Sequence, residues 1–212
     1  MDVMVAGGHG KVGLRLLKLL AEQGHTARGI IRNPDQAGDL EAAGADAIVC
    51  DLEHDELSGE TLAGVDAVVF AAGAGAGSGA ERKQTMDLGG AVKLMEAAKA
   101  HGVDRYVMVS AMGAADPPEG DEGMAPYLRA KAEADRRLAE SGLDYTIVRP
   151  GRLTDDPGRG SVRAFSSLER GDISRDDVAA VLLAVLETPG TIGRTFDVID
   201  GEQPITEAIA SL

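Results

Sequence analysis

The sequence predicts an α/β fold in which helices cover both faces of one doubly wound parallel sheet of about seven strands. Short apolar strands alternate with helical segments along all 212 residues, which is the pattern of a parallel sheet with crossover helices. The most continuous apolar run, residues 65–72, suits the middle of such a sheet. The length fits a single domain, residues 1–212.

The first half of the chain predicts four strands, each followed by a helix. The strands are expected at residues 2–6, 26–31, 47–52 and 65–72. Helices are expected at residues 11–23, after Asn33-Pro34, near residues 56–63 and at residues 82–101. Gly102 stands where a glycine commonly ends a helix.

The second half continues the alternation but interrupts it with loops. Strands are expected at residues 105–110, 145–148 and 195–199, and helices at residues 126–141 and 172–186, with one helical turn near residues 162–168. Ser174 is the expected N-cap of the last helix. Polar or glycine-rich loops at residues 72–79, 112–125 and 150–172 follow the carboxyl ends of strands, where open α/β sheets bind their ligands. We therefore expect these loops on the substrate side.

Composition limits the classes of function. The formal net charge is −14, which disfavours binding to nucleic acid. Cys50 is the single cysteine and the four histidines show no ligand spacing, so we expect no metal site. No apolar run reaches the ~18 residues of a membrane span, and no secretory signal is recognisable, so we expect a cytoplasmic protein. The acidity fits either a high-salt cytoplasm or a GC-rich genome.

A glycine-rich loop between the first strand and the first helix predicts a dinucleotide site. Its residues are Gly7, Gly8, His9, Gly10, Lys11, Val12 and Gly13. Glycines let the backbone turn tightly and approach a pyrophosphate, and the helix N-terminus offers its free N–H groups to the phosphates. Inside a strand–helix–strand unit, this loop favours a Rossmann-type domain over a glycine turn that serves packing alone.

The end of the second strand favours NADP(H) over NAD(H). Arg32 and Asn33 stand where an NAD site usually has an acidic residue, and an arginine there can pair with the 2′-phosphate. Lys11 is either a second positive charge near the phosphates or a solvated helix lysine. Asp51 and Leu52 either line the adenine pocket or, for Asp51, cap the following turn.

Together with the glycine loop and Arg32, further short motifs make the whole chain resemble the atypical short-chain dehydrogenase/reductases of the small NAD(P)H-binding, NmrA-like type. These motifs are Asp51-Leu52, Ala71-Ala72-Gly73, Val109-Ser110-Ala111, Tyr127-x-x-x-Lys131 and Arg149-Pro150-Gly151. The resemblance places Ala71, Ala72, Gly73, Val109, Pro150, Gly151 and Leu153 along the cofactor.

The resemblance also implies a catalytic constellation of Tyr127, Lys131 and Ser110. An i, i+4 pair shares one face of a helix, so the Lys131 ammonium would lower the pKa of the Tyr127 phenol and bind the nicotinamide ribose. Tyr127 would then act as the general acid or base, while Ser110 would bind the substrate oxygen. In the alternative, Tyr127 only plugs the start of its helix.

These features lead us to expect an NADP(H)-dependent oxidoreductase that transfers hydride to or from a small carbonyl or similar substrate. Two alternatives stay open: an NADP(H)-binding redox sensor without turnover, and an NAD(P)-dependent epimerase. The expected partner is a small-molecule substrate, and the chain is either a monomer or a homodimer.

Overall fold

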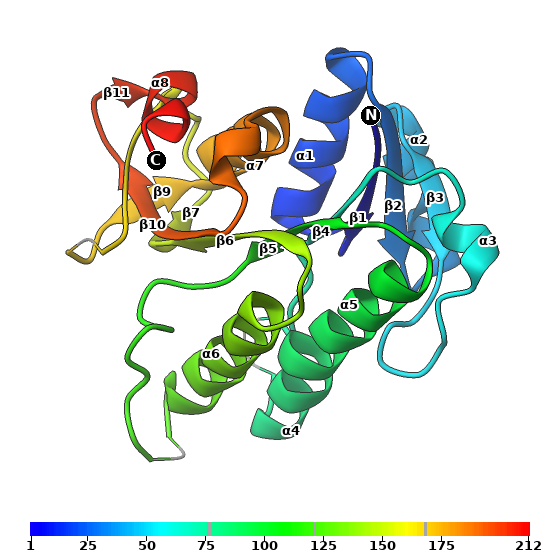
Figure 1. The fold of residues 1–212 in the computed structure, drawn as a ribbon, viewed down its shortest axis with the longest axis horizontal. Coiled ribbons are helices and arrows are strands. Elements are labelled where there is room, and N and C mark those ends of the chain that lie inside the picture. Colours follow the sequence, from blue (N-terminus) through cyan, green and yellow to red (C-terminus); the bar gives the residue numbers. More distant parts are fainter. Residues whose placement is uncertain (76–77, 121, 168) are drawn as a thin grey trace.

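In a computed structural model, which describes residues 1–75, 78–120, 122–167 and 169–212, a nine-stranded sheet separates two layers of helices (Figure 1). Its strands are β1 (Asp2–Ala6), β2 (Thr26–Ile31), β3 (Asp46–Val49), β4 (Ala67–Phe70), β5 (Arg105–Val109), β6 (Asp144–Pro150), β8 (Ser161–Phe165), β10 (Arg194–Asp200) and β11 (Gln203–Pro204). Their order is β11-β8-β10-β6-β5-β4-β1-β2-β3. The seven strands from β10 to β3 are all parallel.

One layer of helices consists of α1 (Lys11–Glu22), α2 (Ala37–Ala42), α7 (Arg175–Glu187) and α8 (Ile205–Ala210). The other consists of α3 (Gly59–Leu62), α5 (Ala91–Ala100) and α6 (Ala125–Ala139). A short α4 (Ala80–Arg82) and a π-helical segment, η2 (Lys83–Gly90), lead into α5. Single 3₁₀ turns, η1 (Pro34–Gln36) and η3 (Pro189–Thr191), precede α2 and follow α7. Figure 1 shows α1 and α7 on one side of the sheet and α5 and α6 on the other.

The central strands feed both cores because their side chains alternate between the two faces of the sheet. In β1, Val3 and Val5 belong to the cluster under α1 and α7, whereas Met4 belongs to the cluster under α5 and α6. All four residues of β4 are buried. A strand covered on both faces must be apolar throughout, which explains the continuous apolar run in the sequence.

The strand order reverses direction between β1 and β4. From β1 the chain winds outward to β2 and β3, then crosses back to β4 and continues through β5 and β6. The loops that follow β1 and β4 therefore lead away from each other, to opposite sides of the sheet. The crevice between two such loops is where doubly wound sheets bind ligands. The predicted fold class is confirmed, and the glycine-rich loop lies at this point.

The structure corrects several details. Within the described residues the main sheet has nine strands rather than about seven, because β8 and β11 extend it in antiparallel fashion beyond β10. The helical turn expected near residues 162–168 is wrong, because β8 occupies residues 161–165. Buried Val162 and Ala164 alternate in it with exposed Arg163 and Phe165, as in a strand with one covered face. A second, two-stranded sheet pairs β7 (Arg152–Thr154) with β9 (Asp172–Ser174). Residues 76–77, 121 and 168 of the expected loops lie outside the described residues.

Candidate cofactor cleft and tyrosine–lysine site

A cleft of about 310 Å³ opens at the carboxyl ends of β1, β2, β3 and β4. It brings together many of the residues that the sequence predicted to hold a cofactor, namely Gly7, His9, Gly10, Arg32, Asp51, Leu52, Ala71, Ala72 and Gly73. Cys50, Glu53, Arg82 and Met86 also line it, although no sequence motif assigns any of these four to the cofactor. They come from the ends of separate elements, so only the folded sheet reveals that they are neighbours.

The glycine-rich loop forms a cradle that side chains would fill. Gly7 has a φ of +82°, and a Cβ on it would lie 2.8 Å from the backbone of Ala72. A Cβ on Gly13 would lie 2.2 Å from the Gly7 carbonyl oxygen. The Gly10 N–H donates to that same oxygen at 2.8 Å. Glycine is therefore required for the turn and for the close packing of α1 on it.

The N-terminus of α1 is suited to an anion. Gly10 is the N-cap, no side chain of the described residues caps the helix, and its first turn contains no acidic residue. The first N–H groups of a helix have no intrahelical acceptor, and they carry the positive end of the helix dipole. The cradle and this helix end together fit the pyrophosphate of a dinucleotide. Val12, by contrast, is buried in the core.

Arg32 is exposed at the mouth of the cleft and makes no hydrogen bond or ion pair with any described residue. Burial would raise the pKa of Asp51, but hydrogen bonds from Glu53 and His54, with the nearby Arg32 charge, outweigh it and lower that pKa. Asp51 therefore stays ionised beside Arg32. Its Oδ1 accepts from the Glu53 N–H at 3.0 Å, so this carboxylate also caps the turn after β3.

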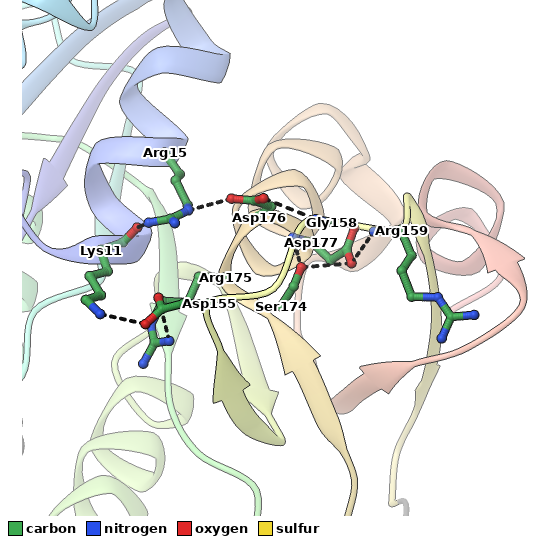
Figure 2. Close-up of polar contacts among 9 residues, drawn as sticks. All are labelled: Lys11, Arg15, Asp155, Gly158, Arg159, Ser174, Arg175, Asp176 and Asp177. Atoms are coloured by element: carbon green, nitrogen blue, oxygen red, sulfur yellow. Dashed lines mark hydrogen bonds and ion pairs between the residues drawn. The ribbon is translucent and has the colours of Figure 1, made fainter.

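Three other loop residues are engaged with protein partners. His9 Nε2 lies 2.7 Å from Asp39 Oδ2 of α2. The Asn33 side chain accepts from the Asp35 N–H at 3.0 Å and caps η1. Lys11 Nζ donates to Asp155 Oδ2 at 2.6 Å (Figure 2).

Tyr127, Lys131 and Ser110 are the predicted catalytic residues, and none of the three is among the described residues that line the cleft above. Lys131 Nζ lies 5.9 Å from the centroid of the Tyr127 ring and 5.5 Å from that of Phe70. It donates to the Val109 carbonyl oxygen at 3.1 Å. Tyr127 and Lys131, the predicted i, i+4 pair, therefore share one face of α6, and the Lys131 ammonium lies over the Tyr127 ring.

Asp87, which sequence reasoning missed, is the counter-ion of Lys131. Its Oδ1 lies 3.3 Å from Lys131 Nζ, and the two side chains are 1% and 3% exposed. Its Oδ2 accepts from the Ala74 N–H at 3.2 Å. Asp87 lies in the π-helical segment η2, a feature that often marks functional sites. In the sequence, the only sign of this buried acid was a single aspartate within the predicted helix at residues 82–101.

Ser110 belongs to a buried polar network. Its Oγ donates to Asp135 Oδ2 at 2.9 Å, and Arg149 Nε donates to the same oxygen at 2.9 Å. Burial raises the pKa of Asp135, against the charge of Arg149 and the hydrogen bond from Ser110. The other oxygen, Oδ1, accepts no hydrogen bond from the described residues. The hydroxyl expected to bind substrate is thus oriented by an acid one turn beyond Lys131.

The electrostatics of Tyr127 differ from the expected activation. Burial raises the pKa of its phenol, the Lys131 ammonium opposes this, and the charges of Asp87 and Asp135 add to it. The phenol is consequently neutral near neutral pH. A neutral phenol can donate a hydrogen bond or a proton to an oxygen, but it is a poor base.

Three further predicted cofactor residues, Pro150, Gly151 and Leu153, lie from the end of β6 into β7. The Gly151 N–H donates to the Val198 carbonyl oxygen at 2.9 Å, and a Cβ on Gly151 would lie 2.2 Å from the Gly171 carbonyl oxygen. The Pro150 carbonyl oxygen accepts from the Met112 N–H at 2.9 Å. Leu153 of β7 packs against the core under α7. This segment is fixed by the backbone next to the carboxyl end of β6.

Two features are absent from the residues that the structure describes. No cluster of three or more histidine, cysteine, aspartate or glutamate side chains is arranged to hold a metal ion. No helix is both long and apolar enough to span a membrane.

Comparisons with known proteins agree on one family. A family profile described as NAD(P)H-binding matches residues 7–189. YhfK of Bacillus subtilis (strain 168), named an uncharacterized sugar epimerase, is 42% identical over 100% of both chains. A Bacillus halodurans structure, provisionally named an NAD-dependent epimerase/dehydratase, is 40% identical over all of both chains with a TM-score of 0.95. The oxidoreductase ylbE of Lactococcus lactis is 29% identical over 100% of this chain and 96% of its own, with a TM-score of 0.86.

Proposed function

The chain belongs to the NAD(P)H-binding family, and on that premise we propose that it is an NADP(H)-dependent oxidoreductase acting on a small carbonyl or similar substrate. The observation that carries the proposal is the cleft itself. A glycine cradle, a helix N-terminus that no described side chain caps and Arg32, which has no partner among the described residues, line one continuous opening. When bound, the nicotinamide would supply or accept the hydride.

Arg32 is the residue that selects NADP(H) over NAD(H) in this proposal. Its guanidinium is exposed and makes no hydrogen bond or ion pair within the described chain, so its donors are available to a 2′-phosphate. The neighbouring Asp51 is engaged by Glu53 and His54 and offers less to ribose hydroxyls than a free carboxylate would. Leu52 and the backbone of residues 71–73 would contact the adenosine half.

Tyr127 is the proton donor in this proposal, and Lys131 and Ser110 support it. Its half-buried, neutral phenol is suited to protonating the oxygen of a carbonyl under reduction. Lys131 supplies positive charge over the ring, and Ser110 supplies a second hydroxyl held by Asp135. Val109, Pro150, Gly151 and Leu153 would flank the nicotinamide. We further propose that the loops at residues 72–79, 112–125 and 150–172 of this single domain 1–212 border the substrate.

Two alternatives each rest on one observation. A redox sensor without turnover is favoured by the engagement of Lys131 with Asp87 and of Ser110 with Asp135. An NAD(P)-dependent epimerase is favoured by the names of the two relatives from Bacillus. An epimerase needs a base to remove a proton, and the neutral Tyr127 disfavours that role.

Calorimetric titration with NADPH and NADH, at low and high salt, tests the cofactor assignment. We expect NADPH to bind more tightly, and Arg32→Ala to reduce the preference by about tenfold, the value of a charge-assisted contact. Arg194→Ala is the matched control, because this exposed arginine begins β10 at the opposite end of the parallel strands. Equal affinity for the two cofactors in the unmodified protein would remove the proposed role of Arg32, and binding of neither would overturn the function.

A second readout locates the cofactor without relying on activity. Cys50 is the only cysteine of the sequence, and it lines the cleft. Burial, with the charge of Asp55, raises the pKa of its thiol, so alkylation should be slow and easily followed. Saturating NADPH should slow it further. An unchanged rate under saturating NADPH would place the cofactor elsewhere.

Turnover separates the enzyme from the sensor. With NADPH and a panel of small aldehydes and ketones, Tyr127→Phe should abolish reduction and leave NADPH affinity unchanged. NADPH binding without reduction of any compound would favour the sensor. Turnover that survives the substitution would refute the role of Tyr127 as the acid.

A further inference from the structure

Two basic side chains from opposite ends of the chain share one carboxylate beside the glycine-rich loop. Lys11 Nζ donates to Asp155 Oδ2 at 2.6 Å, and an Arg175 terminal nitrogen donates to Asp155 Oδ1 at 2.9 Å. Figure 2 shows the two cations converging on Asp155 from α1 and from α7. The hydrogen bond from Lys11, with the Arg175 charge, outweighs the effect of burial and lowers the pKa of Asp155. Asp155 is therefore an ionised oxyanion held between two cations.

The first turn of α7 fixes the loop that carries Asp155. The Gly158 N–H donates to Asp176 Oδ2 at 3.1 Å, and Arg15 of α1 donates to Asp176 Oδ1 at 2.5 Å. Arg15 also donates to the Lys11 carbonyl oxygen at 2.6 Å. Asp176 consequently ties the loop after β7 to the same turn of α1 from which Lys11 projects.

The next residue, Asp177, holds the rest of the loop. It is 2% exposed and accepts from the N–H groups of Arg159 and Gly160, each at 2.8 Å. Ser174 Oγ also donates to it at 2.9 Å. These contacts hold the backbone at residues 158–160, whereas the Asp155 side chain is bound only by Lys11 and Arg175 in the described chain.

Burial distinguishes Arg175, though not the exposed Lys11, from an ordinary surface cation. The Arg175 side chain is 21% exposed, and a single nitrogen of its guanidinium has a partner among the described residues. Asp155 is 51% exposed, so its ion pairs are solvated and contribute little. A mostly buried guanidinium, with donors that no described residue uses and facing an easily displaced carboxylate, is suited to a stronger oxyanion. A phosphate group carries more charge than a carboxylate and has more acceptor oxygens for the guanidinium donors.

We propose that Lys11 and Arg175 form an oxyanion site that Asp155 fills until a phosphate or carboxylate group of a ligand displaces it. Lys11 is the first residue of α1, so the site borders the phosphate cradle of the proposed function, on which the inference rests for its ligand. The oxyanion has two sources: the cofactor phosphate nearer the nicotinamide, or an anionic group on the substrate. Arg175 would determine specificity in either case.

Calorimetry with three probes tests the site and separates the sources. NADPH carries both bridging phosphates, 2′,5′-ADP lacks the nicotinamide half, and inorganic phosphate represents a substrate anion. If the source is the cofactor, Arg175→Gln should weaken NADPH about tenfold and leave 2′,5′-ADP unchanged. If the source is the substrate, the same variant should keep NADPH affinity and lose the binding of inorganic phosphate to the protein saturated with NADPH.

Asp155→Asn provides a test with the opposite sign. This substitution removes the carboxylate charge that competes with the ligand. The affinity for NADPH or for inorganic phosphate, whichever depends on Arg175, should therefore increase several-fold. If Asp155 were merely structural, that affinity would be unchanged or reduced. Arg175→Lys should keep part of the affinity. Arg136→Gln is the matched control, since that exposed arginine is also paired with carboxylates.

The outcomes are distinct for the two proposals. If Arg175→Gln alters neither NADPH nor phosphate binding, or if Asp155→Asn weakens both, the oxyanion site is overturned while the proposed function stands. If the unmodified protein binds neither NADPH nor 2′,5′-ADP, the proposed function fails. Titration of inorganic phosphate into the cofactor-free protein and into Arg175→Gln then decides the oxyanion site alone.

Discussion

Lys131 Nζ lies 3.3 Å from Asp87 Oδ1, and both side chains are almost completely withdrawn from solvent. The pair joins η2 to α6 below Tyr127, next to the Phe70 ring at the end of β4. In a medium of low polarity each charge is tolerated only while the other is present. The relationship therefore links the stability of the fold to the electrostatics of the proposed proton donor.

Removal of either charge should destabilise the protein strongly. We expect Asp87→Asn and Lys131→Met each to lower the free energy of unfolding by about 3–5 kcal/mol, because each leaves an uncompensated buried charge. The double variant should lose less than the sum. Urea unfolding of the four proteins measures the coupling. Lys18→Met, which breaks an exposed pair with Glu22, should change stability by no more than about 1 kcal/mol, and additive losses at Asp87 and Lys131 would refute the pairing.

The phenol of Tyr127 should titrate above the ordinary tyrosine value of about 10, because burial, together with Asp87 and Asp135, outweighs Lys131. Ultraviolet absorbance of phenolate measures this directly, and the sequence has three tyrosines. Subtraction of the titration of the Tyr127→Phe variant isolates the contribution of Tyr127 to the absorbance. If that component ionises below the ordinary value, the lysine activates the tyrosine after all, and the case against a basic role is lost.

Gly13→Ala should disrupt the phosphate cradle. The added Cβ would lie 2.2 Å from the Gly7 carbonyl oxygen, so α1 or the loop must move, and we expect NADPH binding to be lost together with some stability. Gly38→Ala is the control, because a Cβ at this helical position meets nothing within 4 Å and should raise stability by up to about 1 kcal/mol. Calorimetry and urea unfolding report the two effects, and unaltered NADPH binding by Gly13→Ala would contradict the cradle.

The sequence predicted the seven parallel strands and the glycine-rich part of the cleft because both depend on local patterns. Apolar runs and glycine spacing identify a strand–loop–helix unit before any tertiary contact is known. The strand β8 was missed, although its apolar Val162 and Ala164 already alternate in the sequence with Arg163 and Phe165, which are exposed in the structure. It spans one short segment in an irregular region, where helix and strand periods are hard to distinguish.

The acids beneath the tyrosine site were not predictable in the same way. Asp87 and Asp135 lie in helical segments, where a charged residue normally indicates the solvated face. Their partners, Lys131 for Asp87 and Ser110 with Arg149 for Asp135, come from other elements of the fold. Only the packing of η2 and α6 against the sheet determines that these carboxylates are buried.

Asp200, the last residue of β10, should make stability depend on pH. Burial, followed by the charge of Asp177, raises the pKa of its carboxyl, against a hydrogen bond from the Ser174 backbone and the Arg159 charge. Its Oδ1 accepts no hydrogen bond from the described residues. Between the unfolded value of about 3.9 and the raised folded value, the folded state binds more protons than the unfolded state, so this group's contribution to stability falls as pH rises.

Asp200→Asn should remove that contribution. We expect the variant to be more stable than the unmodified protein near neutral pH, with a difference that shrinks as the pH falls toward about 4, where the unmodified carboxyl is also protonated in the folded state. Urea unfolding across this pH range measures the difference, with the exposed Asp46 of β3 replaced by asparagine as the control. A difference that stays constant or grows toward acidic pH would contradict this prediction. It would mean that the folded protein stabilises the Asp200 carboxylate, rather than destabilising it through burial and the charge of Asp177.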